Sequence, residues 1–325
     1  MTISRSESKD APRWLVWLAL WTVYIVWGST YLAIRVTVET LPPLLTAGVR
    51  FIAAGLIVVV VLALRRGRAG VRVSLRELRS SAIVGALLLL GGNGMVVLAE
   101  RDVSSSLAAL VIASVPLWVV LFRAVTGEKV SRGTLIGVAI GFAGVAVLVL
   151  PGDQPAGTTV LGMALLVFAA ASWASGSFAS TRLRLPQDPF LSTAMQMLCG
   201  GAWLVLAGLV TGEAGRIDVE GFSAASIFAF FYLIFAGSLA AFTAYVWLLQ
   251  NAPISKVSTY AYVNPVIALL LGWIILDERL TAPMLVGAAV IVASVAFIVT
   301  HEATPRRRAR GVEAPEPEPA LAGAD

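Results

Sequence analysis

Long apolar runs alternate with short polar stretches from Trp14 to Thr300. In Ser255–Leu280, twenty residues without a charge separate Lys256 from Asp277. A helix of that length crosses a hydrocarbon core of about 30 Å. The pattern predicts ten membrane-spanning helices: Trp14–Ile34, Leu44–Leu64, Ser81–Ala99, Ser105–Val125, Gly133–Leu150, Thr159–Ser180, Phe190–Val210, Ala225–Leu248, Lys256–Leu276 and Pro283–Thr300.

The predicted helices repeat at a spacing of 146 to 150 residues. Pro116 in the fourth helix matches Pro265 in the ninth, and Trp27 in the first matches Trp173 in the sixth. Each half holds five helices, an odd number, so the two halves enter the membrane from opposite sides. We therefore expect an all-α integral membrane protein of two inverted five-helix repeats, the architecture of alternating-access carriers.

Composition and charge support this class. Hydrophobic residues make up 58% of the chain and charged residues 13%, with a mean hydropathy of +0.87; a soluble domain has about 25% charged residues. A single cysteine, Cys199, forms no disulfide within the chain, and the single histidine, His301, lies in the C-terminal tail. We expect no metal site and, despite a net charge of +5, no nucleic-acid partner.

The distribution of Lys and Arg predicts the orientation. With the N-terminus inside, nineteen lie in cytoplasmic segments, four in outer segments and one, Arg50, inside a helix. This bias places both termini in the cytoplasm. Residues 1–13 form a polar N-terminal tail before a retained first helix, and 301–325 form a Pro/Glu/Ala-rich tail that we expect to be disordered.

Four segments resemble the EamA family of the drug/metabolite transporter superfamily: Trp27–Arg35, Arg50–Gly55, Gly91–Glu100 and Ala261–Gly272. The resemblance implies repeats over 14–150 and 159–300 and a bacterial inner-membrane location. It implies a central cavity lined by helices one to four and six to nine, with helices five and ten packed outside. It also implies export of small metabolites or drugs, often amino-acid-like.

Polar and aromatic side chains inside the predicted helices are the candidates for solute binding, because polar groups in hydrocarbon usually face a wet cavity or another helix. These candidates are Trp27, Arg50, Asn93, Trp173, Gln196, Tyr245 and Tyr260. Arg50 is interpreted either as a counter-charge for a carboxylate-bearing solute or as a structural ion-pair partner of Glu100, and the pair is slightly favoured. Asn93 and the aromatic rings allow helix packing as well as solute binding.

Other residues are expected to shape the bundle. Pro116 and Pro265 each remove a backbone hydrogen bond in a helix, which makes a kink or hinge. Gly137 and Gly141 lie four residues apart in the fifth helix, where small side chains allow close helix contact.

We identify no catalytic residue and no cofactor, and the sequence contains no phosphate-binding loop for ATP. Acidic residues lie near the helix ends, so proton coupling has no obvious mid-membrane carboxylate; facilitated exit and coupling through Glu100 both remain open. The alternatives to transport are a lipid-processing membrane enzyme, which would need a catalytic cluster, and a membrane scaffold. The expected partners are a small-molecule solute and the bilayer.

Overall fold

The computed structural model describes residues 12–150, 155 and 157–303. The predicted tails at 1–13 and 301–325 therefore lie almost entirely outside the described residues. Over the described residues, nine helices are long and apolar enough to cross a membrane, and Tyr260–Leu276 is a shorter tenth. The chain is an all-helical, multi-pass membrane protein, as predicted.

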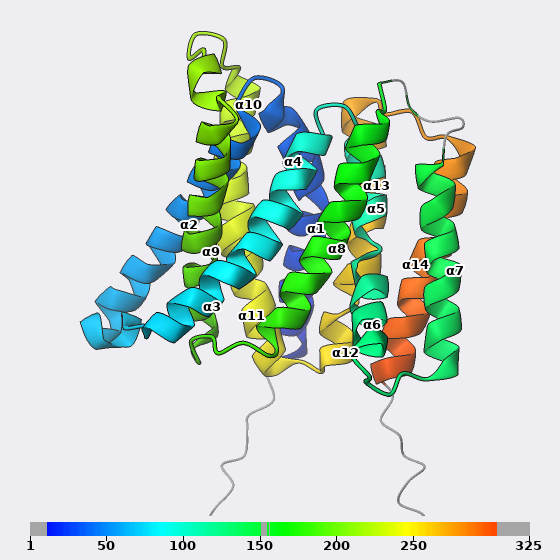
Figure 1. The fold of residues 1–325 in the computed structure, drawn as a ribbon, viewed down its shortest axis with the longest axis horizontal. Helices are drawn as coiled ribbons and strands as arrows, with labels where there is room; N and C mark the ends of the chain where they lie inside the picture. Colours follow the sequence, from blue (N-terminus) through cyan, green and yellow to red (C-terminus); the bar gives the residue numbers. More distant parts are fainter. Residues whose placement is uncertain (1–11, 151–154, 156, 304–325) are drawn as a thin grey trace, which may run out of the picture.

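The first repeat contains α1 (Arg13–Val38), α2 (Pro43–Arg66), η1 (Arg68–Val71), α3 (Leu75–Gly85), η2 (Ala86–Gly94), α4 (Met95–Ala99), α5 (Ser105–Ile112), α6 (Val115–Val125) and α7 (Arg132–Val149). The second contains α8 (Val160–Ser180), α9 (Pro189–Val210), η3 (Glu213–Arg216), α10 (Ala224–Tyr232), η4 (Leu233–Ala240), α11 (Ala241–Asn251), α12 (Ile254–Val257), α13 (Tyr260–Leu276) and α14 (Ala282–Ala303). Figure 1 shows α1 and α8 starting on opposite faces of the bundle, as inverted repeats require.

Side-chain caps set many of the helix starts. A hydroxyl or carboxylate accepts a hydrogen bond from the backbone N–H three residues later, which satisfies one of the free donors of the first turn. The capping residues are Ser74, Ser104, Ser131, Thr159, Asp188 and Ser223.

Matched helices of the two repeats pack against each other at the two lateral sides of the bundle: α2 on α9, and α7 on α14 (Figure 1). Glycines allow the close contact between α2 and α9. A Cβ added to Gly48 would lie 2.9 Å from the backbone oxygen of Gly201, and one added to Gly201 would lie 2.8 Å from that of Gly48. The position of α7 and α14 at the edge agrees with their expected place outside the other helices.

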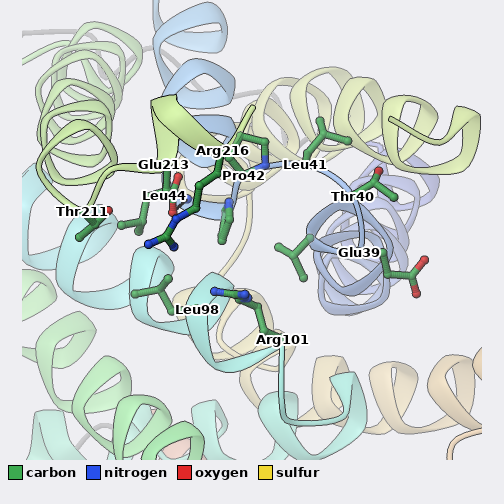
Figure 2. A pocket seen from close by; sticks show the side chains of 12 residues that line it. Glu39, Thr40, Leu41, Pro42, Leu44, Leu98, Arg101, Thr211, Glu213 and Arg216 are labelled. Carbon is green, nitrogen blue, oxygen red and sulfur yellow. Dashed lines mark hydrogen bonds between the residues drawn. The ribbon is translucent and has the colours of Figure 1, made fainter. Parts of the chain in front are cut away.

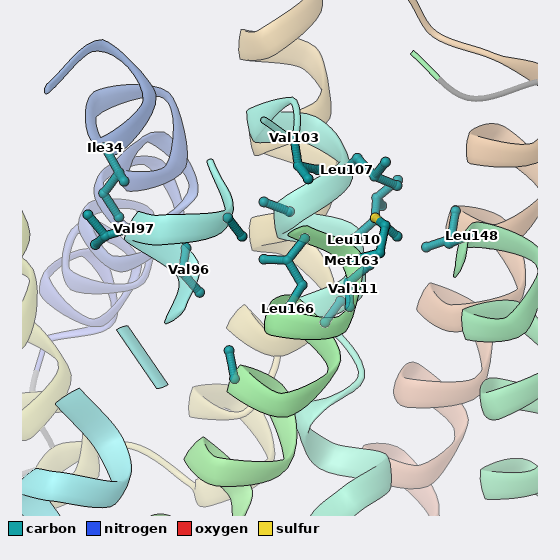
Figure 3. Close-up of a cluster of buried hydrophobic side chains, with 14 of the residues drawn as sticks. Ile34, Val96, Val97, Val103, Leu107, Leu110, Val111, Leu148, Met163 and Leu166 are labelled. Carbon is teal, nitrogen blue, oxygen red and sulfur yellow. The ribbon is translucent and has the colours of Figure 1, made fainter. Parts of the chain in front are cut away.

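The apolar core joins both halves. Val96 and Val97 of α4, Leu107 and Leu110 of α5 and Met163 of α8 belong to one buried cluster; Figure 3 shows Leu107 and Leu110 close to Met163. All five side chains are at least nine-tenths buried. Large apolar residues also cover the outer surface of the helices, where lipid replaces water as the surrounding medium.

Two predicted helices are interrupted. The fourth breaks at Ala113 and Ser114, between α5 and α6. The ninth starts at Tyr260 and not at Lys256, because the short helix α12 ends at Val257 before α13 begins. The membrane-spanning part of the ninth helix is therefore shorter than its apolar run.

Candidate functional site

The most unusual local structure lies at matched positions in the third and eighth membrane crossings. Both contain a π-helical segment, η2 in the first repeat and η4 in the second. A π-helical turn widens the helix and disturbs its regular hydrogen bonding, and such turns are frequent at functional sites. The candidate solute-binding residues form two groups, one near each of these segments.

Side chains from the opposite repeat bond to each segment. On α1, Trp27 Nε1 donates to the backbone oxygen of Gly237 in η4, at 3.2 Å. On α8, Ser172 Oγ donates to the backbone oxygen of Leu87 in η2, at 2.8 Å. The matched tryptophans Trp27 and Trp173 thus lie on helices that pack in equivalent ways.

Arg50 of α2 faces η4. Its Nε donates to Ser238 Oγ at 3.0 Å, and its guanidinium lies 4.6 Å from the centroid of the Phe51 ring. A Cβ added to Gly237 would be 3.5 Å from Nη2 of Arg50, so the glycine keeps space beside the charge. Arg50 is only 6% exposed. The site therefore contains a buried cation beside a π-helical turn.

The favoured ion pair between Arg50 and Glu100 is wrong. Arg50 turns toward η4, and neither carboxylate oxygen of Glu100 has a hydrogen-bond partner in the described structure. Instead, Arg35 of α1 donates to the backbone oxygens of Glu100 and Arg101. The sequence predicts that Arg50 and Glu100 lie near the same membrane surface. It does not give the rotation of each helix about its axis, which decides where the two side chains point.

Three aromatic side chains, Trp27, Tyr245 and Tyr260, form a cluster. The ring centroids of Trp27 and Tyr245 are 5.1 Å apart, those of Trp27 and Tyr260 are 5.3 Å apart, and those of Tyr245 and Tyr260 are 5.6 Å apart. Helices α1, α11 and α13 supply one ring each. Trp27 bonds to Gly237, and Arg50 lies beside the space where a Gly237 side chain would be, so both residues lie at the same turn of η4. We name Arg50 together with the aromatic triad the η4 site.

The other candidates lie around η2. A Cβ added to Gly92 would be 2.7 Å from Cε3 of Trp173, so the ring packs directly on the π-helical backbone. Asn93 has a buried Oδ1 with no hydrogen-bond partner in the described structure. Gln196 matches Arg50 by position, but its Nε2 donates to Ser192 of its own helix at 3.0 Å. The two repeats therefore match in packing but differ in chemistry.

The predicted structural residues differ in their surroundings. Pro116 lies in the first turn of α6, directly after the break in the fourth crossing, whereas Pro265 lies inside α13. The α7 glycines face α14: added Cβ atoms would be 3.1 Å from Phe297 at Gly137 and 3.2 Å from Ser294 at Gly141.

Four contacts between the repeats, near the membrane surfaces, were not predicted from the sequence. Arg66 pairs with Asp188 at 2.5 Å, and Arg182 pairs with Glu128. Glu213 accepts from the backbone N–H of Leu44, and Glu278 from that of Ser105. Each acidic residue lies between two membrane helices, and this position is the indication that the sequence offered. We call these contacts the end latches.

Two surface cavities lie at the ends of the bundle. One, of about 270 Å³, is lined by Arg101, Glu213 and Arg216 (Figure 2). The other, of about 210 Å³, is lined by Arg13, Trp17 and Lys256. None of the seven candidate solute-binding residues lines either cavity. The η4 site is therefore separated from both surface cavities.

Comparisons with known proteins agree with this architecture. The chain is 38% identical over 283 residues to the uncharacterized inner membrane transporter YedA of Escherichia coli (strain K12), with 86% of this chain and 89% of YedA covered. It is 28% identical over 307 residues to the uncharacterized transporter YvbV of Bacillus subtilis (strain 168), covering 94% and 98% of the two chains.

A solved structure titled "Crystal structure of protein" shares the fold. It matches with a TM-score of 0.60 and 22% identity, over 90% of this chain and 98% of that one. The model of the EamA-like transporter family matches twice, at residues 13–150 and 160–300. The chain therefore belongs to the EamA-like transporter family.

Proposed function

We propose that this transporter exports small amphipathic metabolites or drugs, with amino-acid-like solutes favoured, by secondary transport across the bacterial cytoplasmic membrane. The observation that carries the proposal is the η4 site, where the buried cation of Arg50 lies at Gly237, the residue to which Trp27 of the aromatic triad donates a hydrogen bond. Within the described structure, no carboxylate lies at ion-pair distance from Arg50.

A solute carboxylate would complement this charge. A buried guanidinium is costly without an anionic partner, and a charge-assisted hydrogen bond is stronger than a neutral one. The aromatic triad would then accept an apolar or aromatic side chain. A single buried cation suits a single carboxylate better than a phosphate, which carries more charge.

The end latches support alternating access. On the face of the bundle where α1 starts and α14 ends, Arg66–Asp188 and Arg182–Glu128 join the repeats. On the opposite face, Glu278 joins the second repeat to α5 of the first. Exposed ion pairs are worth about 0–1 kcal/mol each, so the two ion-pair latches, Arg66–Asp188 and Arg182–Glu128, open at low cost.

The proposed orientation places both termini in the cytoplasm. It rests on the nineteen-to-four distribution of Lys and Arg. The inner-membrane location is supported by the name of the E. coli relative. Export, as opposed to import, follows from the family resemblance and is part of the proposal.

Uptake by proteoliposomes tests the function. A panel of labelled amino acids and small aromatic metabolites is offered to the wild type, Arg50→Gln and the charge-conserving control Arg50→Lys. We expect uptake of at least one panel member, its loss in Arg50→Gln and its partial recovery in Arg50→Lys, at equal protein levels. Loss of Arg50→Gln from the membrane, with Arg50→Lys normal, would instead assign Arg50 a structural role.

A further inference from the structure

The carboxyl group of Glu100 is buried without a partner. Glu100 follows α4 directly, outside the membrane-spanning segment Leu75–Ala99, and is 0% exposed. Neither of its carboxyl oxygens accepts a hydrogen bond in the described structure. An ionised carboxylate in such a place is strongly destabilised, whereas the protonated form is tolerated. The geometry therefore favours a proton on Glu100.

Two groups of α1 interact electrostatically with this carboxyl. Tyr31 is within electrostatic range of it. The guanidinium of Arg35 lies close, but it donates to backbone oxygens, that of Arg101 at 2.8 Å. Arg35 consequently neutralises the Glu100 carboxyl only in part.

The other charged neighbour repels a negative charge on Glu100. Glu278, in the loop after α13, accepts from Ser105 N at 2.7 Å, from Ser105 Oγ at 2.8 Å and from Ser106 N at 2.9 Å. These three bonds fix the position of the Glu278 side chain at the start of α5, where the helix dipole favours negative charge. A second anion at Glu100 would be destabilised by Glu278.

The residues that precede Glu100 belong to the apolar core. Val97 and Ala99 are part of the buried cluster that also contains Leu44 of α2 and Met163 of α8. No water-exposed path reaches the carboxyl, since the residue has no exposed area. A change of its charge therefore requires this end of the bundle to move.

We propose that Glu100 holds a proton while this face is closed and exchanges it with water when α5 separates from the loop that carries Glu278. The inference rests on the proposed transport function and names its coupling ion. The step is a simple proton transfer: the carboxyl O–H bond breaks, the carboxylate keeps the electron pair and a water molecule takes the proton. Exit of solute through this face would then be linked to proton exchange.

The charge environment gives the sign of the pH dependence. Burial raises the pKa of Glu100 well above its ordinary value; Glu278 raises this pKa further, and Arg35 lowers it. Opening would hydrate the carboxyl and return its pKa toward the ordinary value. The closed arrangement therefore binds the proton more tightly. The fraction of molecules in the closed arrangement falls as the pH rises from the ordinary pKa of this carboxyl to its raised pKa.

Two measurements on the full-length protein in nanodiscs test the proposal without a solute. Infrared difference spectra between acidic and alkaline pH should contain the band of a protonated, buried carboxyl in the wild type and lack it in Glu100→Gln. Hydrogen exchange of residues 104–112, corrected for intrinsic rates, should rise with pH by up to about tenfold per unit in the wild type and stay flat in Glu100→Gln. Glu220→Gln, in an exposed loop, is the matched control and should resemble the wild type in both.

A proton flux completes the test. With a solute identified by the uptake panel, an imposed pH gradient of one unit should raise accumulation by up to about tenfold in the wild type. Accumulation independent of the gradient would overturn coupling and leave the transport function standing. If no panel member is transported, the proposed function fails, and the carboxyl band still decides whether Glu100 holds a proton. Should Glu100→Gln fold poorly, Glu100→Asp should show the same band at a shifted position, and its absence there would refute the site.

Discussion

The contact of α7 with α6 and α14 provides a sharp test of the packing. We consider Gly141→Ala and Gly141→Leu. A Cβ at Gly141 would lie 2.6 and 2.8 Å from the two methyl carbons of Leu117 and 3.2 Å from Cβ of Ser294. Carbon atoms in good contact are about 3.5–4.0 Å apart, so the neighbours must move by roughly 1 Å.

That movement has little room. Leu117 is fully buried on α6, and Ser294 approaches from α14, so a shift away from one helix presses on the other. Overpacking of this kind costs about 1–3 kcal/mol, and the larger leucine should cost more than alanine. We therefore expect Gly141→Ala to lower the free energy of unfolding by about 1–3 kcal/mol, with solute preference unchanged.

Gly133→Ala is the matched control on the same helix. A Cβ there meets nothing closer than 3.8 Å, so the change should be neutral or stabilise by up to about 1 kcal/mol through helix propensity. Unfolding by SDS in mixed micelles, followed by tryptophan fluorescence, measures all three variants. A Gly141→Leu protein with wild-type stability and an altered solute preference would refute the reasoning, because Gly141 would then line the solute path.

Two further predictions concern topology and the η4 site. Reporter fusions after Arg68 should read cytoplasmic and those after Arg216 periplasmic, and the opposite result at both positions would invert the proposed orientation. Trp27→Phe removes the hydrogen bond to Gly237 and keeps an aromatic ring, so it should cost about 0.5–1.5 kcal/mol of unfolding free energy in the SDS assay. Trp173→Phe is its matched control in the other repeat, and equal costs for both changes would contradict the role of that bond.

Much of the fold follows from hydrophobic length and repeat spacing. Ten apolar runs predicted ten membrane helices, and the matched prolines and tryptophans predicted the inverted halves. The π-helical turns were not predictable, because a local change from i→i+4 to i→i+5 bonding leaves the apolar run intact. The two segments, η2 and η4, became apparent only in the structure.

The candidate site was predicted in part. The depth of Arg50 and the grouping of Trp27 with Tyr245 and Tyr260 follow from their positions on helices that converge, although a sequence does not give the rotation of each helix about its axis. For that reason Arg50 was expected to meet Glu100 and instead bonds to Ser238. For the same reason, the sequence does not show that the buried Glu100 carboxyl lacks a hydrogen-bond partner.

Recognition of a solute carboxylate by Arg50 is the central claim. It is tested most directly by removing the charge from the solute, from the protein, and from both. Exchange is measured for leucine and for leucinamide, which lacks the carboxylate, in the wild type and in Arg50→Gln. A hydrogen bond to a charged group is worth about 1.5–3 kcal/mol, so the wild type should prefer leucine by roughly 10- to 150-fold. Arg50→Gln should lose that preference. An equal preference for leucine in both proteins would contradict the claim and assign carboxylate recognition to a different part of the bundle.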